Sequence, residues 1–216
     1  SIYALRNEKP LTGALIAGGA LLARVPARIF YVSHVSRAQH ERLGYRAAAG
    51  VVIPNGIDTD LFQPLVPDER AAVRAGLGVP PDAPLIGLIA RFHPQKDHAT
   101  FLQAASLAAR AHPDLRVLLA GRDTGPENAT LRALVDAAGL TGRVLLLGER
   151  RDVPRLTAAL DLACSSSVFG EALSLALIEA LACGVPCVVT EVGDSVRLVG
   201  PAGLAVRCLQ DRRIRR

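Results

Sequence analysis

The sequence predicts an α/β protein built on a doubly wound parallel sheet: a Rossmann-like domain preceded by a remnant of a second Rossmann-like domain. Two observations support this fold class. From about residue 84 onward, short continuous apolar runs alternate with helix-patterned stretches, as expected of strands covered on both faces. The 216-residue chain is also 50% hydrophobic but only 4% aromatic, a balance that suits helices packed on a parallel sheet.

The regular part of the chain supplies strands and helices in turn. The expected strands are residues 84–90, 115–120, 143–147, 162–164, 186–190 and 203–206. The expected helices between them are residues 98–111, 128–138, 153–160 and 172–182, with Asn128 as an N-cap and Gly139 as a helix end. Because the loops are short, we expect right-handed crossovers and one parallel sheet.

A different pattern precedes this unit. Residues 28–33 and 51–54 resemble strands, residues 37–43 resemble a helix, and a Pro-rich stretch around a short helix follows. We therefore divide the chain into the end of a separate domain (1–60), a linker and lead-in (61–84), a Rossmann-like domain (85–206) and a basic tail (207–216).

The net charge of +5 fits a nucleic acid, an anionic membrane surface or a phosphorylated ligand. Basic residues gather at 24–46 and 207–216 without interleaved aromatics, and no helix-turn-helix or zinc-finger pattern is found. We therefore expect no nucleic-acid partner, whereas peripheral association with an anionic membrane surface stays open.

The cysteines indicate a reducing compartment. They form no C-x-x-C pair and are expected to be buried free thiols: Cys164, Cys183, Cys187 and Cys208. The longest apolar run, residues 14–23, is too short to span a bilayer, and no secretory signal is visible. We expect a cytoplasmic protein, at most peripheral to the inner face of the membrane.

In an open parallel sheet, ligands bind beyond the carboxyl ends of the strands. Arg91 ends the first strand of the regular unit, and Lys96 follows in the loop before a helix. Two cations beside a helix N-terminus form a diphosphate clamp, although solvated surface charge is the alternative. Gly121 and Gly148 end the next two strands and allow close backbone approach, but either alone is an ordinary turn glycine.

Two carboxylates follow the fourth strand. Glu171 ends a polar loop at the mouth of the expected helix, where the helix dipole favours negative charge. Glu179 comes after seven intervening residues, about two turns into a helix of Ala, Leu and Ile. An unpaired carboxylate there is costly, so we expect it to face the cleft and accept hydrogen bonds from a pair of ligand hydroxyls. An exposed helix face is the alternative.

Three ordered motifs resemble glycosyltransferase family 4, the glycosyl transferases group 1 family, over about residues 28–203. They are residues 52–58 (VIPNGID) with Phe62, residues 90–97 (ARFHPQKD), and residues 169–171 (FGE) continued by residues 179–186 (EALACGVP). The resemblance implies the C-terminal half of a GT-B fold. It further implies a retaining glycosyltransferase that moves a hexose-type sugar from a nucleoside diphosphate sugar to a glycan or lipid-linked acceptor, in polysaccharide or glycolipid biosynthesis.

The resemblance also implies roles for individual residues. Arg91 and Lys96 would hold the diphosphate and support the departing charge, Glu179 would bind the ribose, and Glu171 would lie near the donor sugar. The remaining implied donor contacts are Gly170 and the backbone amides of Ala172, Leu173, Ser174 and Leu175, with the base beside Gly121, Gly148 and Arg150. No cofactor and no metal are expected, and His93 and His98, across one loop, have no further ligand partners in the sequence.

The chain departs from the family pattern in three places. Residues 173–175 (LSL) stand where the family often has Phe-Pro-Asn, only the last strands of the N-terminal domain are present, and the chain ends in a basic tail. We expect a fragment that transfers no sugar by itself. The alternatives are a nucleotide-sugar-binding remnant without transferase activity, or an epimerase or phosphorylase on the same fold.

Overall fold

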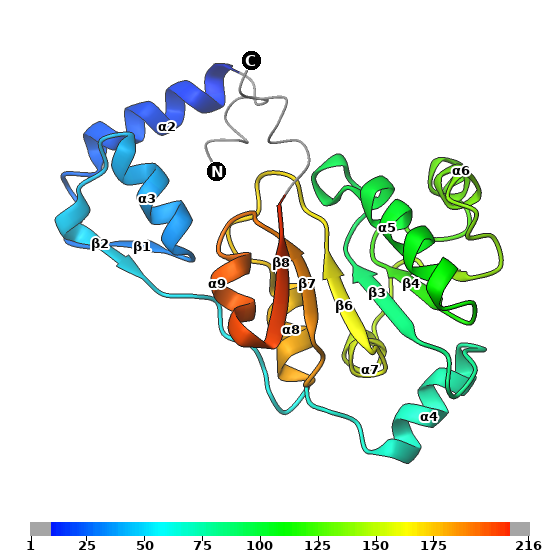
Figure 1. The fold of residues 1–216 in the computed structure, drawn as a ribbon. Coiled ribbons are helices and arrows are strands. Elements are labelled where there is room, and N and C mark those ends of the chain that lie inside the picture. Colours follow the sequence, from blue (N-terminus) through cyan, green and yellow to red (C-terminus); the bar gives the residue numbers. More distant parts are fainter. Residues whose placement is uncertain (1–9, 208–216) are drawn as a thin grey trace.

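The computed structural model describes residues 10–207, which hold two parallel sheets (Figure 1). The smaller sheet and its helices comprise, in chain order, α2 (Pro10–Leu22), β1 (Ile29–Tyr31), α3 (His34–Arg42), a 3-10 turn (Ala47–Ala49) and β2 (Gly50–Val52). The expected strand–helix–strand pattern is confirmed, and α2 is an additional helix. Cys208 and all but the first residue of the basic tail lie outside the described residues.

The larger sheet has six parallel strands in the order β5-β4-β3-β6-β7-β8. Numbered from β3, this is the 3-2-1-4-5-6 order of a Rossmann fold, so the predicted doubly wound sheet is confirmed. The strands are β3 (Leu85–Ile89), β4 (Arg116–Ala120), β5 (Val144–Leu146), β6 (Leu162–Ser165), β7 (Cys187–Thr190) and β8 (Gly203–Val206).

Helices cover both faces of this sheet (Figure 1). Val117 and Leu119 of β4 pack in one apolar cluster with residues of α5 and α6, while Leu118 and Ala120 pack in the other with residues of α7 and α8. All four are fully buried, which explains why the strand reads as a continuous apolar run. The helices are α5 (His98–Ala111), α6 (Ala129–Ala137), α7 (Val153–Ala158), α8 (Leu175–Ala182) and α9 (Ser195–Val199).

Helix boundaries follow local capping where the sequence offers a cap. The Asn128 side chain accepts a hydrogen bond from the Leu131 amide at 3.0 Å, as expected of the N-cap of α6. Asp97 caps α5 through the Thr100 amide at 3.2 Å, while its own backbone takes a left-handed conformation with φ 44°. The predicted start of α5 at His98 is therefore confirmed.

The start predicted for α8, residue 172, is wrong by three residues. The Ala172 carbonyl accepts a hydrogen bond from the Asp194 amide at 3.1 Å and so does not begin a helical ladder. Gly193 allows this contact because it has φ 62°, and a Cβ there would lie 2.0 Å from the Glu171 carbonyl oxygen. The helix begins only at Leu175, after a residue in extended conformation.

Helix α4 (Pro67–Gly76) fastens the lead-in segment to the amino ends of the strands. Arg74 is 3% exposed and donates to the carbonyls of Ala159 and Ala83 and to the Asp161 carboxylate. Burial raises the pKa of Asp161, but the Leu85 amide and the arginines Arg70 and Arg74 outweigh it and hold that pKa below its usual range. The network joins α4 to the residues that precede β3 and β6.

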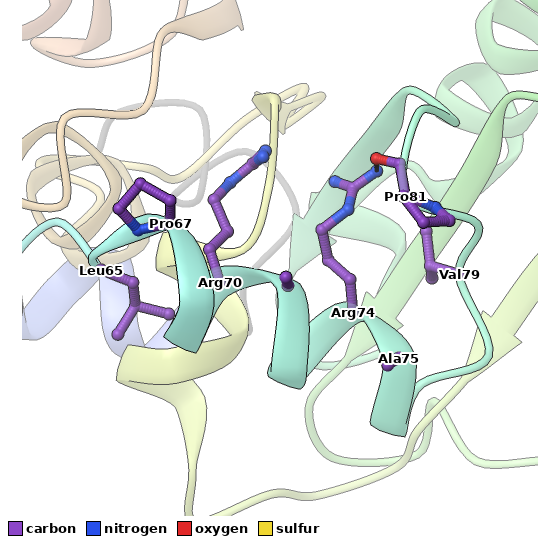
Figure 2. Close-up of a pocket in the computed structure, with 8 residues that line it drawn as sticks. Leu65, Pro67, Arg70, Arg74, Ala75, Val79 and Pro81 are labelled. Atoms are coloured by element: carbon purple, nitrogen blue, oxygen red, sulfur yellow. Dashed lines mark hydrogen bonds between the residues drawn. The ribbon is translucent and has the colours of Figure 1, made fainter.

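A hollow of about 320 Å³ lies beside α4 (Figure 2). Its lining is mainly apolar, and its two cations, Arg70 and Arg74, are already paired with Asp161. The hollow lies at the amino ends of the strands, opposite the edge at which ligands bind open α/β sheets. We therefore assign it to the anchoring of α4.

Asp194 joins the two sheet units. It is the N-cap residue of α9, yet its side chain makes no capping bond to that helix. Instead, its two carboxylate oxygens accept hydrogen bonds from the amides of His34 at 2.7 Å and Val35 at 2.9 Å, at the start of α3. A carboxylate suits this place because the first amides of a helix lack backbone partners and carry partial positive charge.

Within residues 10–207, no helix combines the length and the apolar character that crossing a bilayer requires.

Replacing Asp194 with Ala should loosen α3. The change removes two hydrogen bonds to a charged acceptor, and each such bond contributes about 1.5–3 kcal/mol. We expect the hydrogen exchange of the His34 and Val35 amides to accelerate by roughly ten- to a hundredfold. Amide exchange followed by NMR measures this directly. Asp114→Ala, a change of the same type at an exposed turn, serves as the control. Unchanged exchange at both amides in Asp194→Ala would contradict the assignment.

Candidate functional site

The candidate site lies where the strand order of the larger sheet reverses, between β3 and β6. β3 pairs with β4 on one side and with β6 on the other, so the loops that follow β3 and β6 leave the sheet next to each other. These loops are joined by two hydrogen bonds, from the Val168 amide to the Gln95 carbonyl at 2.9 Å and from the Ser166 hydroxyl to the Lys96 carbonyl at 2.6 Å. A crevice at such a reversal is the usual ligand site of a doubly wound sheet.

Lys96 and Glu171 meet between these two loops. The Lys96 ammonium forms an ion pair with Oε2 of Glu171, and the two side chains are only 18% and 12% exposed. The hydroxyl of Ser167 donates to the same Oε2 at 3.1 Å. We expected Glu171 to lie at the start of a helix whose dipole stabilises its charge, and this expectation is wrong. Helix α8 begins only at Leu175, and the Lys96 ammonium supplies the compensating charge.

The two predicted cations flank the start of α5. Arg91 lies two residues beyond Ile89, the last residue of β3, and is exposed; within the described residues its side chain makes a long contact of 3.4 Å to Gln95. Lys96 closes a 3-10 turn (Pro94–Lys96), whose first amide is capped by the ring of His93. Among residues 10–207, no carboxylate pairs with Arg91. Its guanidinium can therefore bind an anion without breaking an existing ion pair.

The two predicted glycines also come together. The Gly121 amide donates to the Gly148 carbonyl at 2.8 Å, which joins the ends of β4 and β5. Gly121 has φ 140°, and a Cβ at this position would lie 2.5 Å from the Ala90 carbonyl oxygen. The neighbouring backbone thus requires a glycine here whether or not a ligand also approaches.

Arg150 is committed to another partner. Its guanidinium binds both carboxylate oxygens of Asp152, at 2.8 and 2.6 Å, and both side chains are well exposed. This hydrogen bond holds the pKa of Asp152 below its usual range. A nucleotide base placed beside Gly148 would have to compete with the Asp152 carboxylate for the Arg150 guanidinium.

Glu179 is the fifth residue of α8, little more than one turn from its start rather than the expected two. Its side chain is partly buried, and no hydrogen bond to it is found within the described residues. Burial raises the pKa of Glu179 because no donor compensates for the lost water. This carboxylate therefore has unused capacity to accept hydrogen bonds.

His93 and His98 have different roles. The Nδ1 atom of His93 accepts a hydrogen bond from the Gln95 amide at 3.2 Å. His98 is 2% exposed, contacts the ring of Phe92 edge-on, and has no hydrogen-bond partner on either ring nitrogen. Burial lowers the pKa of His98 to about 4, so the ring is neutral at pH 7.

Several contributors to the site are not evident from motif spacing. Ser167 contacts Glu171, and the Thr190 hydroxyl donates to the Ser167 carbonyl at 2.5 Å. The sequence signal for these residues is that the apolar strands β6 and β7 each end in a hydroxyl residue, Ser165 and Thr190. The sequence also contains an Asp-x-Asp triplet, residues 58–60, where the Asp58 carboxylate accepts hydrogen bonds from the Asp60 and Leu61 amides and so shapes a turn just before the lead-in segment.

The three cysteines within the described residues are free, as expected. Burial raises the pKa of Cys164 to about 12 and that of Cys187 to about 11. These thiols are protonated near pH 7 and unreactive as nucleophiles.

Comparison with known proteins shows the family of this chain. Residues 69–206 match the family model described as glycosyl transferases group 1. The lipopolysaccharide core biosynthesis mannosyltransferase LpsB of Rhizobium meliloti is 36% identical over 162 residues, which are 71% of this chain and 45% of that protein. A GDP-mannose-dependent phosphatidylinositol monomannoside mannosyltransferase of Corynebacterium glutamicum is 32% identical, over 71% of this chain and 42% of its own length.

Solved structures give the same result. The crystal structure of Anabaena HepE in complex with UDP-glucose has a TM-score of 0.77 and 28% identity, and the match covers 92% of this chain and 55% of that one. The sucrose-phosphate synthase of Thermosynechococcus elongatus has a TM-score of 0.75 and 25% identity, over 92% of this chain and 50% of that one. The chain thus spans about half the length of the proteins it matches.

The buried His98 should make stability depend on pH. Its folded pKa of about 4 lies below the ordinary 6.5, so the unfolded chain binds a proton that the folded protein does not. The free energy of unfolding therefore falls as the pH drops below 6.5 and stops falling near 4. Between about pH 7.5 and pH 5 this one group should remove roughly 2 kcal/mol. Urea unfolding at several pH values, compared with His98→Leu, tests this. Equal pH slopes in both proteins would show that His98 is not the cause.

Proposed function

The chain belongs to the glycosyl transferases group 1 family, and from that premise we propose that its crevice binds a nucleoside diphosphate sugar. The sugar, a hexose-type unit, is then transferred to a glycan or lipid-linked acceptor with retention of configuration at the anomeric carbon. The observation that carries this proposal is the meeting of Lys96 and Glu171 between the loops that follow β3 and β6. A cation for the diphosphate and a carboxylate for sugar hydroxyls lie side by side there.

In this proposal the Lys96 ammonium leaves the Glu171 carboxylate and binds the diphosphate when the donor enters. A phosphate oxygen is a strong acceptor for an ammonium group, and the amino end of α5 and the free Arg91 add positive potential at the same edge. The departing diphosphate carries the charge that develops in the reaction, so these groups assist by stabilising it. Glu171, freed from its ion pair, then accepts hydrogen bonds from the sugar. No metal ion or cofactor is assigned a role.

Glu179 binds the ribose in this proposal. A partly buried carboxylate without a hydrogen-bond donor is unfavourable, and two neighbouring hydroxyls supply the missing donors. The ribose of a nucleotide carries such a pair. The raised pKa of Glu179 supports a site that is incomplete until its ligand arrives.

The relatives define the range of donors to test. One structural neighbour was crystallised with UDP-glucose, and one relative is named as GDP-mannose-dependent. A thermal-shift screen of this chain with UDP, GDP and ADP identifies the nucleotide base that the site prefers, from the largest rise in melting temperature. Transfer itself is proposed for a protein of the relatives' full length, because the chain spans about half of them.

Replacing Lys96 with Ala should weaken binding of the selected nucleoside diphosphate. Hydrogen bonds to charged groups are worth about 1.5–3 kcal/mol, which corresponds to a roughly 10- to 150-fold rise in Kd. The corresponding nucleoside, which has no phosphate, should bind as to wild type. Isothermal titration in EDTA measures both ligands and removes any contribution from a divalent metal.

The matched control is Arg110→Ala, which removes a positive charge from the last turn of α5, at the opposite end of the helix that follows Lys96. It should leave both Kd values within about twofold of wild type. If Lys96→Ala weakens the nucleoside as much as the diphosphate, the lysine acts on the fold rather than on phosphate.

Replacing Glu179 with Gln separates function from stability. The amide keeps the size of the side chain and removes a charge that no donor compensates, so the melting temperature should stay unchanged or rise. Nucleoside diphosphate affinity should nevertheless fall by about 5- to 30-fold, since the ribose loses a charged acceptor. Differential scanning fluorimetry and titration give the two values. Unchanged affinity would mean that Glu179 is only a residue on the face of a helix.

A further inference from the structure

Ser167 occupies an unusual place for a short polar side chain. It is 1% exposed, lies in the loop after β6, and its hydroxyl donates to Oε2 of Glu171 at 3.1 Å. A buried hydroxyl with a single charged acceptor has little freedom to turn elsewhere. It therefore acts as a fixed donor to a carboxylate that otherwise relies on one long, flexible lysine side chain.

The backbone of Ser167 is itself held in place. The Thr190 hydroxyl, 8% exposed at the end of β7, lies 2.5 Å from the Ser167 carbonyl and 3.3 Å from the Ser165 carbonyl. On the other side, the next residue, Val168, donates its amide to the Gln95 carbonyl at 2.9 Å. Ser167 is thus fixed between β7 and the loop that carries Lys96.

The two oxygens of Glu171 have different surroundings. Oε2 receives both the Lys96 ammonium and the Ser167 hydroxyl, whereas Oε1 has no hydrogen-bond partner among the described residues. One oxygen is therefore held by the protein, and the other is available. A ligand hydroxyl can reach Oε1 without displacing Ser167.

We propose that Ser167 is a positioning residue, which holds Oε2 of Glu171 so that the carboxylate keeps its orientation when Lys96 turns to the diphosphate. This inference rests on the proposed function and names the group that serves the sugar half of the same site. A neutral hydroxyl suits the task because it stabilises the carboxylate without attracting the phosphate groups. Once Lys96 has changed partner, Ser167 is the remaining donor that the structure shows on Glu171.

The test compares Ser167→Ala with wild type using two probes, UDP and UDP-glucose, or GDP and GDP-mannose if the screen selects guanosine. Affinity for the bare diphosphate should stay within about twofold, because Lys96 and Glu179 are intact. Affinity for the sugar nucleotide should fall about fivefold or more, since the carboxylate that meets the sugar is no longer held. Ser167→Cys, of similar size and with a weak donor, should give an intermediate loss.

The matched control is Ser165→Ala, at the buried last residue of β6, whose hydroxyl makes no hydrogen bond within the described residues. It should bind both probes as wild type does. Equal losses for the two probes in Ser167→Ala, or no loss for the sugar nucleotide, would overturn the proposal.

A second measurement needs no ligand. Crystal structures of wild type and Ser167→Ala should show one orientation of the Glu171 carboxylate in the former and more than one in the latter. If wild type binds no nucleoside diphosphate, the proposed function fails, yet this comparison still decides whether Ser167 positions Glu171. A single, unchanged orientation in Ser167→Ala would refute the positioning role.

Discussion

The reversal of the chain around β3 is the constraint on which the rest of the structure depends. Crossovers between parallel strands are right-handed, so building outward from β3 in one direction and then from β6 in the other puts the helices on opposite faces. The loops after β3 and β6 leave the sheet side by side at this reversal, where two hydrogen bonds join them, and the carboxyl edge at such a reversal is the usual ligand site of a doubly wound sheet. The apolar strands fix this geometry, because every residue of β4 from Val117 to Ala120 is buried against helices on one face or the other.

The two carboxylates that follow β6, Glu171 and Glu179, differ in how their charge is compensated. Lys96 and Glu171 compensate each other, so two partly desolvated charges are stable together and can exchange partners when a ligand brings its own. Glu179 has no such partner, and its raised pKa records that its burial is not compensated. The first arrangement compensates both charges within the protein, whereas the second leaves a carboxylate that can still accept hydrogen bonds.

The turn from Thr190 to Asp194 connects this crevice with the preceding unit. Thr190 holds the backbone of the Ser167 loop, Gly193 lies against the carbonyls of Glu171 and Ala172, and Asp194 binds the start of α3. Three residues of this five-residue turn thus contact either the loop that carries Glu171 or a helix of the smaller sheet unit.

The sequence alone determined the larger sheet and the polar loops at the carboxyl ends of its strands. The apolar runs, caps such as Asn128, and the placement of Arg91, Lys96 and Glu171 after strands are local or periodic signals, and these survive folding because strand burial and capping are local requirements. Only the tertiary structure decided which side chains pair. That Lys96 binds Glu171, that Arg150 turns to Asp152, and that Asp194 caps α3 rather than α9 depend on contacts between segments far apart in sequence or on competing local partners. The late start of α8 has the same origin, because the backbone of Glu171 and Ala172 is held against Gly193 and the distant Asp194 amide. Sequence periodicity carries no information about such competition, and the packed fold resolves it.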